Sequence, residues 1–149
     1  MTTLAAGWSK GRRIVVATAI AGTFDILAAT FLTLLYHRSP AAMLRSVASG
    51  PFPGASSWGT AGSLLGLATH FVLMAIMASV FVLAADRYPA LKHRWIAAAI
   101  GYGLITFVVM NLIVVPLRFG SMPGAMAVAT QLFCHIALVA LPIAAVARR

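Results

Sequence analysis

Acidic residues are almost missing from this sequence of 149 residues. Only Asp25 and Asp86 stand against eleven Lys and Arg, and charged residues make up 9% of the chain. An ordinary soluble domain has about 25% charged and about 45–50% apolar residues, whereas 62% of this chain is hydrophobic. These proportions exclude a soluble globular domain. The net charge of +9 reflects missing carboxylates more than a basic surface for nucleic acid, so we expect no nucleic-acid partner.

Cysteine and the common catalytic motifs are also scarce. Cys134 is the only cysteine, so the chain can form no internal disulfide and has no pair of thiols for exchange chemistry. The sequence contains no HExxH motif, no glycine-rich phosphate loop and no recognisable Ser–His–Asp grouping. The absence of these motifs argues against an enzyme without excluding one.

Long apolar runs are what the sequence has in abundance. Four of them, each 23 to 27 residues long, occupy residues 14–36, 59–85, 95–117 and 124–147. A helix needs about 20 residues to cross the hydrocarbon layer, and continuous apolar runs lack the alternation of barrel strands. The sequence predicts an all-α polytopic membrane protein. Residues 1–149 would form a single transmembrane domain, a four-helix bundle with the lipid bilayer as its main partner.

One connection, residues 37–58, is longer than the others. Ser39 and Pro40 have the character of a helix start, whereas Gly50 and Pro51 have that of a stop. About ten residues between them would form a short external helix, apolar except for Arg45 and Ser46. We expect this helix to lie at the membrane interface. The alternative is a partly re-entrant plug, which requires a backbone buried in protein or facing water.

The basic residues predict an orientation. Eight of them would share one side of the membrane: Lys10, Arg12, Arg13, Arg87, Lys92, Arg94, Arg148 and Arg149. Only Arg38, Arg45 and Arg118 would lie on the other side. Because basic residues are enriched in cytoplasmic loops, both termini should be cytoplasmic. A bacterial inner membrane fits this multi-pass arrangement best.

Three ionisable residues fall near the middle of the predicted spans. Asp25, His70 and His135 are each the twelfth residue of their run. An unpaired carboxylate at mid-depth costs about 2.5–3.5 kcal/mol on insertion scales, so Asp25 must be protonated, paired or hydrated. Asn111 and Gln131 fall in the outer half, and together these five residues predict a polar pocket that opens outward.

Small residues lie near these groups and would let the helices approach closely. They include Gly22 in the first run, Gly62 and Gly66 in the second, and Ala97 and Gly101 in the third. A purely structural hypothesis stays open: a buried Asp–His hydrogen bond, with Asn111 and Gln131 joining helices. Measured interhelical polar pairs stabilise membrane proteins by only about 0.6 kcal/mol on average. This gain is smaller than the cost of placing an unpaired carboxylate at mid-membrane.

Several segments resemble a group of short four-span bacterial inner-membrane proteins of unknown function, loosely the YagU-type proteins. They are Ala-Gly-Thr-Phe-Asp-Ile at 21–26, Leu-Arg-Ser-Val-Ala-Ser-Gly at 44–50, Leu-Gly-Leu-Ala-Thr-His-Phe at 65–71, Gly-Tyr-Gly at 101–103, Met-Asn at 110–111 and Val-Pro-Leu at 115–117. The loop departs from the pattern at Pro51, Phe52 and Pro53. The resemblance implies the topology but no activity. It also directs attention to Asp25, Arg45, Ser49, Gly50, His70, Tyr102 and Asn111.

Three functions are compatible with these features. The first is binding or transport of a proton, cation or small polar solute by Asp25, His70, His135, Asn111 and Gln131, in a layout similar to the small multidrug transporters and hence as a homodimer. The second is a structural or accessory subunit of a membrane complex, or an envelope-stress protein. The third is a bis-His haem protein with His70 and His135 as axial ligands. A divalent metal at Asp25 and these histidines is a related alternative; otherwise no cofactor is expected.

Overall fold

The computed structural model describes residues 7–149, and within that range every regular element is a helix. The first two apolar runs form α1 (Lys10–Leu35) and α3 (Gly59–Arg87). The third run forms α5 (Trp95–Phe107), η2 (Val108–Val114) and α6 (Val115–Phe119), and the fourth forms α7 (Ala125–Phe133), η3 (Cys134–Ala140) and α8 (Leu141–Ala147). Short connections contain α2 (Pro40–Ser49), η1 (Pro53–Ser57) and α4 (Ala90–His93).

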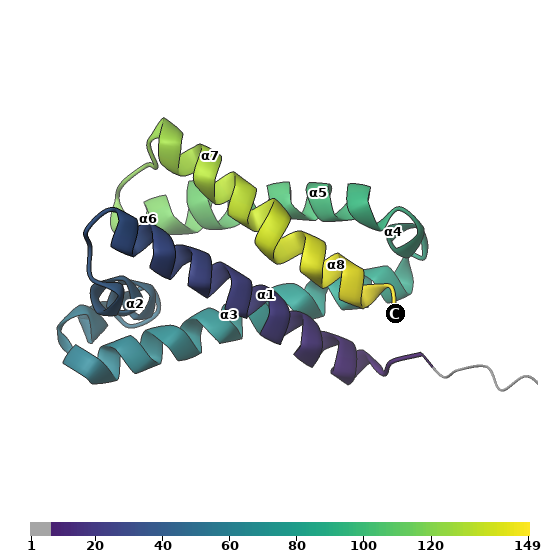
Figure 1. Ribbon diagram of the computed structural model, residues 1–149, viewed down its shortest axis with the longest axis horizontal. Coiled ribbons are helices and arrows are strands. Elements are labelled where there is room, and N and C mark those ends of the chain that lie inside the picture. The colour runs from purple at the N-terminus through teal and green to yellow at the C-terminus, as the bar shows by residue number, and fades with distance from the viewer. Residues whose placement is uncertain (1–6) are drawn as a thin grey trace, which may run out of the picture.

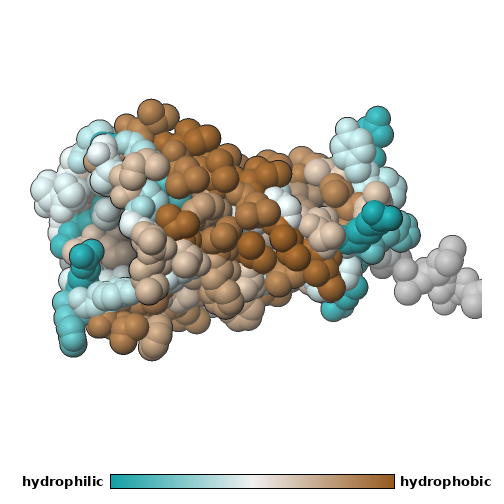
Figure 2. All heavy atoms as spheres, turned by 90° about the horizontal axis from the view of Figure 1, so that it is seen from above, coloured by the Kyte–Doolittle hydropathy of each residue, from teal (hydrophilic) through white to brown (hydrophobic). Residues whose placement is uncertain are grey.

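Four helical segments are long and apolar enough to cross a membrane: Lys10–Leu35, Gly59–Arg87, Trp95–Phe119 and Ala125–Ala147. They match the four predicted runs to within a few residues at each end. Apolar side chains form a belt around the middle of the molecule in the face seen in Figure 2, and hydrophilic side chains gather at both ends. The chain is thus compatible with an integral membrane protein that crosses the bilayer four times.

The two ends of the molecule differ in the connections they carry. The start of α1, the C-terminus and α4 lie at one end, whereas α2 and the link between α6 and α7 lie at the other (Figure 1). The basic residues therefore divide between the ends as the sequence analysis expects, eight with the termini and three with α2.

Two stretches of wide π-helical turns interrupt the last two long helices. Each stretch ends two residues before a proline, Pro116 or Pro142. Proline lacks an N–H and its ring clashes with the carbonyl one turn back, and a wider turn separates these groups. Both helices continue past these prolines through a local change of winding.

The short helix α2 begins and ends where the sequence predicts. The Ser39 hydroxyl accepts a hydrogen bond from the Ala42 N–H at 3.3 Å, and Pro40 occupies the first turn. The helix is seen nearly end-on in Figure 1, so its axis runs across those of the long helices. It packs mainly on the first turns of α3.

The glycines reveal which helices approach most closely. A Cβ atom at Gly66 would overlap the Leu44 carbonyl of α2, and one at Gly62 would overlap the Ala55 carbonyl of η1. These glycines therefore accommodate the short connection rather than another spanning helix. A Cβ at Gly22 would lie 2.7 Å from the Phe71 ring of α3, so Gly22 does join two long helices.

The small pair in the third span, Ala97 and Gly101, does not serve close packing within the described chain. A Cβ at Gly101 would meet no atom within 4 Å. Gly103 takes that role, because its Cβ would lie 2.8 Å from the Ile136 Cα of η3. The predicted close contact was placed on the wrong face of this helix.

Candidate functional site

Asp25 and His70 face each other across the contact between α1 and α3. The Asp25 Oδ2 lies 3.9 Å from the His70 Nδ1. The imidazole is buried, and the carboxylate retains 20% of its side-chain exposure. The two mid-span residues that the sequence singles out are thus neighbours, separated by slightly more than a hydrogen-bond length.

A backbone contact fixes the His70 ring. The His70 Nε2 lies 2.9 Å from the Gly22 carbonyl oxygen, and because a carbonyl only accepts, Nε2 carries the hydrogen. The second ring nitrogen, Nδ1, is then the atom that faces Asp25. One additional proton can reside on this pair, either on the carboxyl group or on Nδ1. Gly22 therefore has two roles in this contact. Its carbonyl accepts the hydrogen bond from His70, and its lack of a Cβ leaves room for the Phe71 ring of α3.

His135 approaches the same region from the fourth long helix. Its Nδ1 lies 2.9 Å from the Gln131 carbonyl, to which it donates, and its ring packs edge-on against Phe107 with centroids 6.0 Å apart. α1 packs against η3 as well as α3, so the helix that carries Asp25 contacts both helices that carry the histidines. The described structure therefore brings the three ionisable residues into one region, with Asp25 and His70 in the shortest of these contacts.

A pocket of about 430 Å³ opens beside this cluster, and we call it the α1–α7 pocket. Its wall is formed by Ala29, Leu32, Thr33, Tyr36, Arg38, Met43, Met126, Ala127, Thr130 and Gln131. Asp25 precedes Ala29 by four residues and so lies one turn further along the same face of α1. His135 follows Gln131 by four residues on the opposite wall. Both walls of the pocket therefore lead inward to the ionisable cluster.

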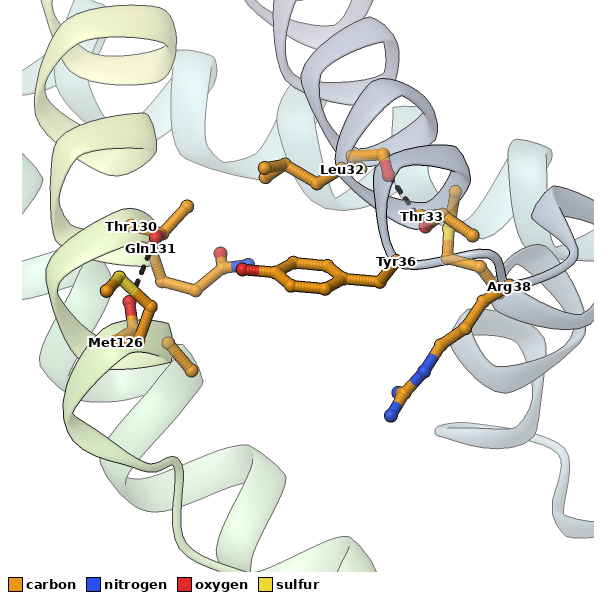
Figure 3. Close-up of a pocket in the computed structure, with 10 residues that line it drawn as sticks. Leu32, Thr33, Tyr36, Arg38, Met126, Thr130 and Gln131 are labelled. Carbon is orange, nitrogen blue, oxygen red and sulfur yellow. Dashed lines mark hydrogen bonds between the residues drawn. The ribbon is translucent and has the colours of Figure 1, made fainter.

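Figure 3 shows how the polar side chains of the pocket lie. The Tyr36 ring extends from α1 toward Gln131 on α7, and Arg38 extends toward the open space below the ring. Thr33 and Thr130 donate to carbonyls of their own helices, at 2.7 and 2.9 Å. Within residues 7–149, the side chains of Tyr36, Arg38 and Gln131 form no hydrogen bond to the protein. These three side chains therefore keep hydrogen-bonding groups that the described protein does not use.

Asn111 does not join this pocket. It lies half-buried in η2 and is not among the residues that form the pocket wall. No hydrogen bond connects it to the ionisable cluster within the described chain.

The loop residues Arg45, Ser49 and Gly50 hold α2 in place. The Arg45 guanidinium lies 3.5 Å from the Ser63 hydroxyl of α3, and the Ser49 hydroxyl donates to the Ser46 carbonyl at 2.7 Å. Arg118 donates to the Ser49 and Gly50 carbonyls at 2.7 and 2.9 Å. Sequence reasoning treated Arg118 only as a flanking charge and so missed its contact with α2.

A second ionic cluster closes the opposite end of the molecule. The Arg13 guanidinium makes two hydrogen bonds of 2.8 Å to the Asp86 carboxylate and a third of 3.0 Å to the Ala147 carbonyl. Lys92 donates to the same carboxylate at 2.6 Å. This cluster joins α1, α3, α4 and the end of α8. Sequence reasoning missed it, although Asp86 was the only carboxylate available to the eight cations at that end.

The possibilities for a cofactor follow from the ring nitrogens. His70 uses Nε2 and His135 uses Nδ1 for backbone hydrogen bonds, so each ring has one nitrogen left for a ligand. Among the described residues, no three His, Cys, Asp or Glu side chains are grouped closely enough to hold a metal ion.

Comparison with known proteins adds no relative. No family model matches the chain, and no similar curated protein or solved structure was found.

Proposed function

We propose that this protein is a small inner-membrane protein that binds, and carries across the bilayer, a small polar solute together with a proton. The observation that supports this most strongly is the Asp25–His70 pair, whose carboxylate lies one helical turn from Ala29 in the wall of the α1–α7 pocket. A carboxylate at mid-membrane raises the free energy of insertion, and a hydrogen bond between helices stabilises the protein by less than this amount. A role in binding explains its position better than a role in packing.

The pair is suited to hold and release one proton. His70 is fixed by Gly22, so Nδ1 stays directed at the carboxylate whether or not the extra proton is present. Asp25 is partly exposed, so its carboxylate is accessible to a proton or solute. Gln131 and Tyr36 would bind the solute one to three turns further out, and His135 would add a second polar group near the carboxylate.

The proposed orientation puts the termini in the cytoplasm, because the end with eight basic residues would follow the charge bias of inner-membrane proteins. The α1–α7 pocket lies at the end with α2, and it would open to the outside. The Arg13–Asp86 cluster would then close the cytoplasmic end, as expected for a carrier observed with one side open.

The proton-binding role is tested by Asp25→Asn in purified protein. We expect the melting temperature of the wild type to change between pH 5 and 8 and this change to be largely lost in the variant, because the amide cannot take up the proton. Asp86→Asn is the matched control, since it removes the other carboxylate at a site outside the pocket; it should lower stability but keep the pH response. An unchanged pH response in Asp25→Asn would contradict the proposal.

The second candidate is an accessory subunit or a homodimer. The Ala97–Gly101 face has no neighbour within the described chain, and small residues in spanning helices commonly mark contacts between helices. A stoichiometric partner that co-purifies with the wild type but not with Gly101→Leu would favour this role. Haem at His70 and His135 predicts a Soret band in protein purified from haem-replete cells.

A further inference from the structure

We infer that the solute of the α1–α7 pocket is a small organic anion, a carboxylate attached to an apolar body. This inference rests on the proposed function and narrows it, since that function leaves the charge of the solute open. It depends on three properties of the pocket: its charge, its walls and its size.

The charge of the pocket is positive. Arg38 is the only charged residue among the ten that form its wall, and no acidic residue is among them. The nearest carboxylate, Asp25, lies further inward and is already paired with His70. A cation in the pocket would be repelled by an unpaired guanidinium next to a low-dielectric layer. An anion would gain charge-assisted hydrogen bonds, for which the planar guanidinium suits a carboxylate best.

The wall of the α1–α7 pocket contains both apolar and polar side chains. Apolar side chains from α1, α2 and α7 supply one part of the surface: Ala29, Leu32, Met43, Met126 and Ala127. The phenol of Tyr36 and the amide of Gln131 add hydrogen-bond donors to the wall that Arg38 also lines. A ligand with a carboxylate at one end and a hydrocarbon body would therefore satisfy both parts of the wall.

The size of the pocket limits this body. A volume of about 430 Å³ lies at the lower end of the range of about 300–1,000 Å³ for small-molecule sites. It admits a single ring or a short branched chain. Benzoate is a suitable probe, because benzamide and the benzamidinium cation have nearly the same shape with neutral and positive charge.

The experiment measures binding of these three probes to the protein in nanodiscs of zwitterionic lipid by isothermal titration calorimetry, with empty nanodiscs correcting for partition. We expect benzoate to bind at least about tenfold more tightly than either analogue, the ratio that one charge-assisted hydrogen bond supplies. Arg38→Gln should remove this preference and Arg38→Lys should restore part of it. Arg94→Gln removes the same charge from the opposite end and should leave binding unchanged.

Three outcomes would overturn the inference. They are tighter binding of benzamidinium than of benzoate, benzoate binding that is equal in the wild type and Arg38→Gln, and no binding of any probe. None of them decides the proposed proton-linked function, which depends on the pH response of Asp25→Asn. Benzamidinium binding that is lost in Asp25→Asn would leave that function standing and make the solute a cation.

Discussion

Gly66 occupies the place where the backbone of α2 crosses α3. The Leu44 carbonyl lies so near that any Cβ at this position would overlap it, and the atom in the way belongs to the backbone rather than to a flexible side chain. Close packing of this kind depends on the absence of a single methyl group. The effect of adding that group is therefore a direct test of the observed position of α2.

We expect Gly66→Ala to lower the free energy of unfolding by about 1–3 kcal/mol, the usual cost of overpacking. The measurement is thermal or denaturant unfolding of the purified protein. Gly101→Ala is the matched control, since the same methyl group would enter open space and alanine favours the helix by about 1 kcal/mol over glycine. Equal losses in both variants would contradict the packing of α2 on α3.

Individual residues also show where sequence reasoning succeeds and where it stops. The equivalent positions of Asp25 and His70 in their runs could be predicted, but whether the two side chains meet could not, because depth alone does not define which face of a helix a residue occupies. The Arg13–Asp86 pair could have been inferred from charge but was not. The Gly22–His70 hydrogen bond could not be predicted, since it depends on how far α1 is rotated against α3, and sequence alone does not define that rotation.

At the scale of elements, Arg118 connects the end of the third long helix to α2. The last carbonyls of a helix have no hydrogen-bond partner within it. The Arg118 guanidinium donates to two such carbonyls of α2, those of Ser49 and Gly50. We expect Arg118→Gln to destabilise the protein by about 1–3 kcal/mol, as for lost hydrogen bonds to a charged donor. Hydrogen exchange of residues 40–50 should accelerate more than that of α3. Exchange that rises uniformly, or not at all, would show that Arg118 does not hold α2.

The Arg13–Asp86 cluster joins four elements at the other end. Removing one member of a buried ion pair costs about 3–5 kcal/mol. The Asp86 carboxylate keeps 18% exposure and a second partner in Lys92, so we expect a loss of about 1–3 kcal/mol for Arg13→Gln. The double variant with Asp86→Asn should be more stable than the two single losses predict, because the uncompensated charge is gone. If the losses in unfolding free energy of the two single variants add up to that of the double variant, this double-mutant cycle would show no interaction energy between Arg13 and Asp86.

The elements themselves were largely predictable. Run length and hydropathy locate the four long helices, and Ser39–Pro40 with Gly50–Pro51 defines the ends of α2. The wide turns before Pro116 and Pro142 were not predicted, because proline alone does not reveal whether a helix kinks, stops or changes its winding. This change alters which side chains within and beyond the wide turns face the interior. The close contact at Gly103 rather than Gly101 lies before η2 and depends instead on the rotation of α5 against η3.

At the scale of the whole molecule, the two ends differ in charge, with eight basic residues at one and three at the other. The charge bias predicts that the end with the termini faces the cytoplasm. Cys134 is the only cysteine and is buried, so Cys134→Ala provides a background in which single exposed cysteines report on each end. Ser121, between α6 and α7, and His93, in α4, are both exposed and lie at opposite ends.

In intact bacterial cells we expect a membrane-impermeant maleimide to label Ser121→Cys and to label His93→Cys only after the membrane is disrupted. The reverse pattern would put the α1–α7 pocket on the cytoplasmic side and invert the proposed direction of opening. Labelling of both positions in intact cells would indicate insertion in two orientations, which a bias of eight to three in basic residues opposes. Either result would also contradict the proposal that the Arg13–Asp86 cluster lies at the cytoplasmic end in every molecule.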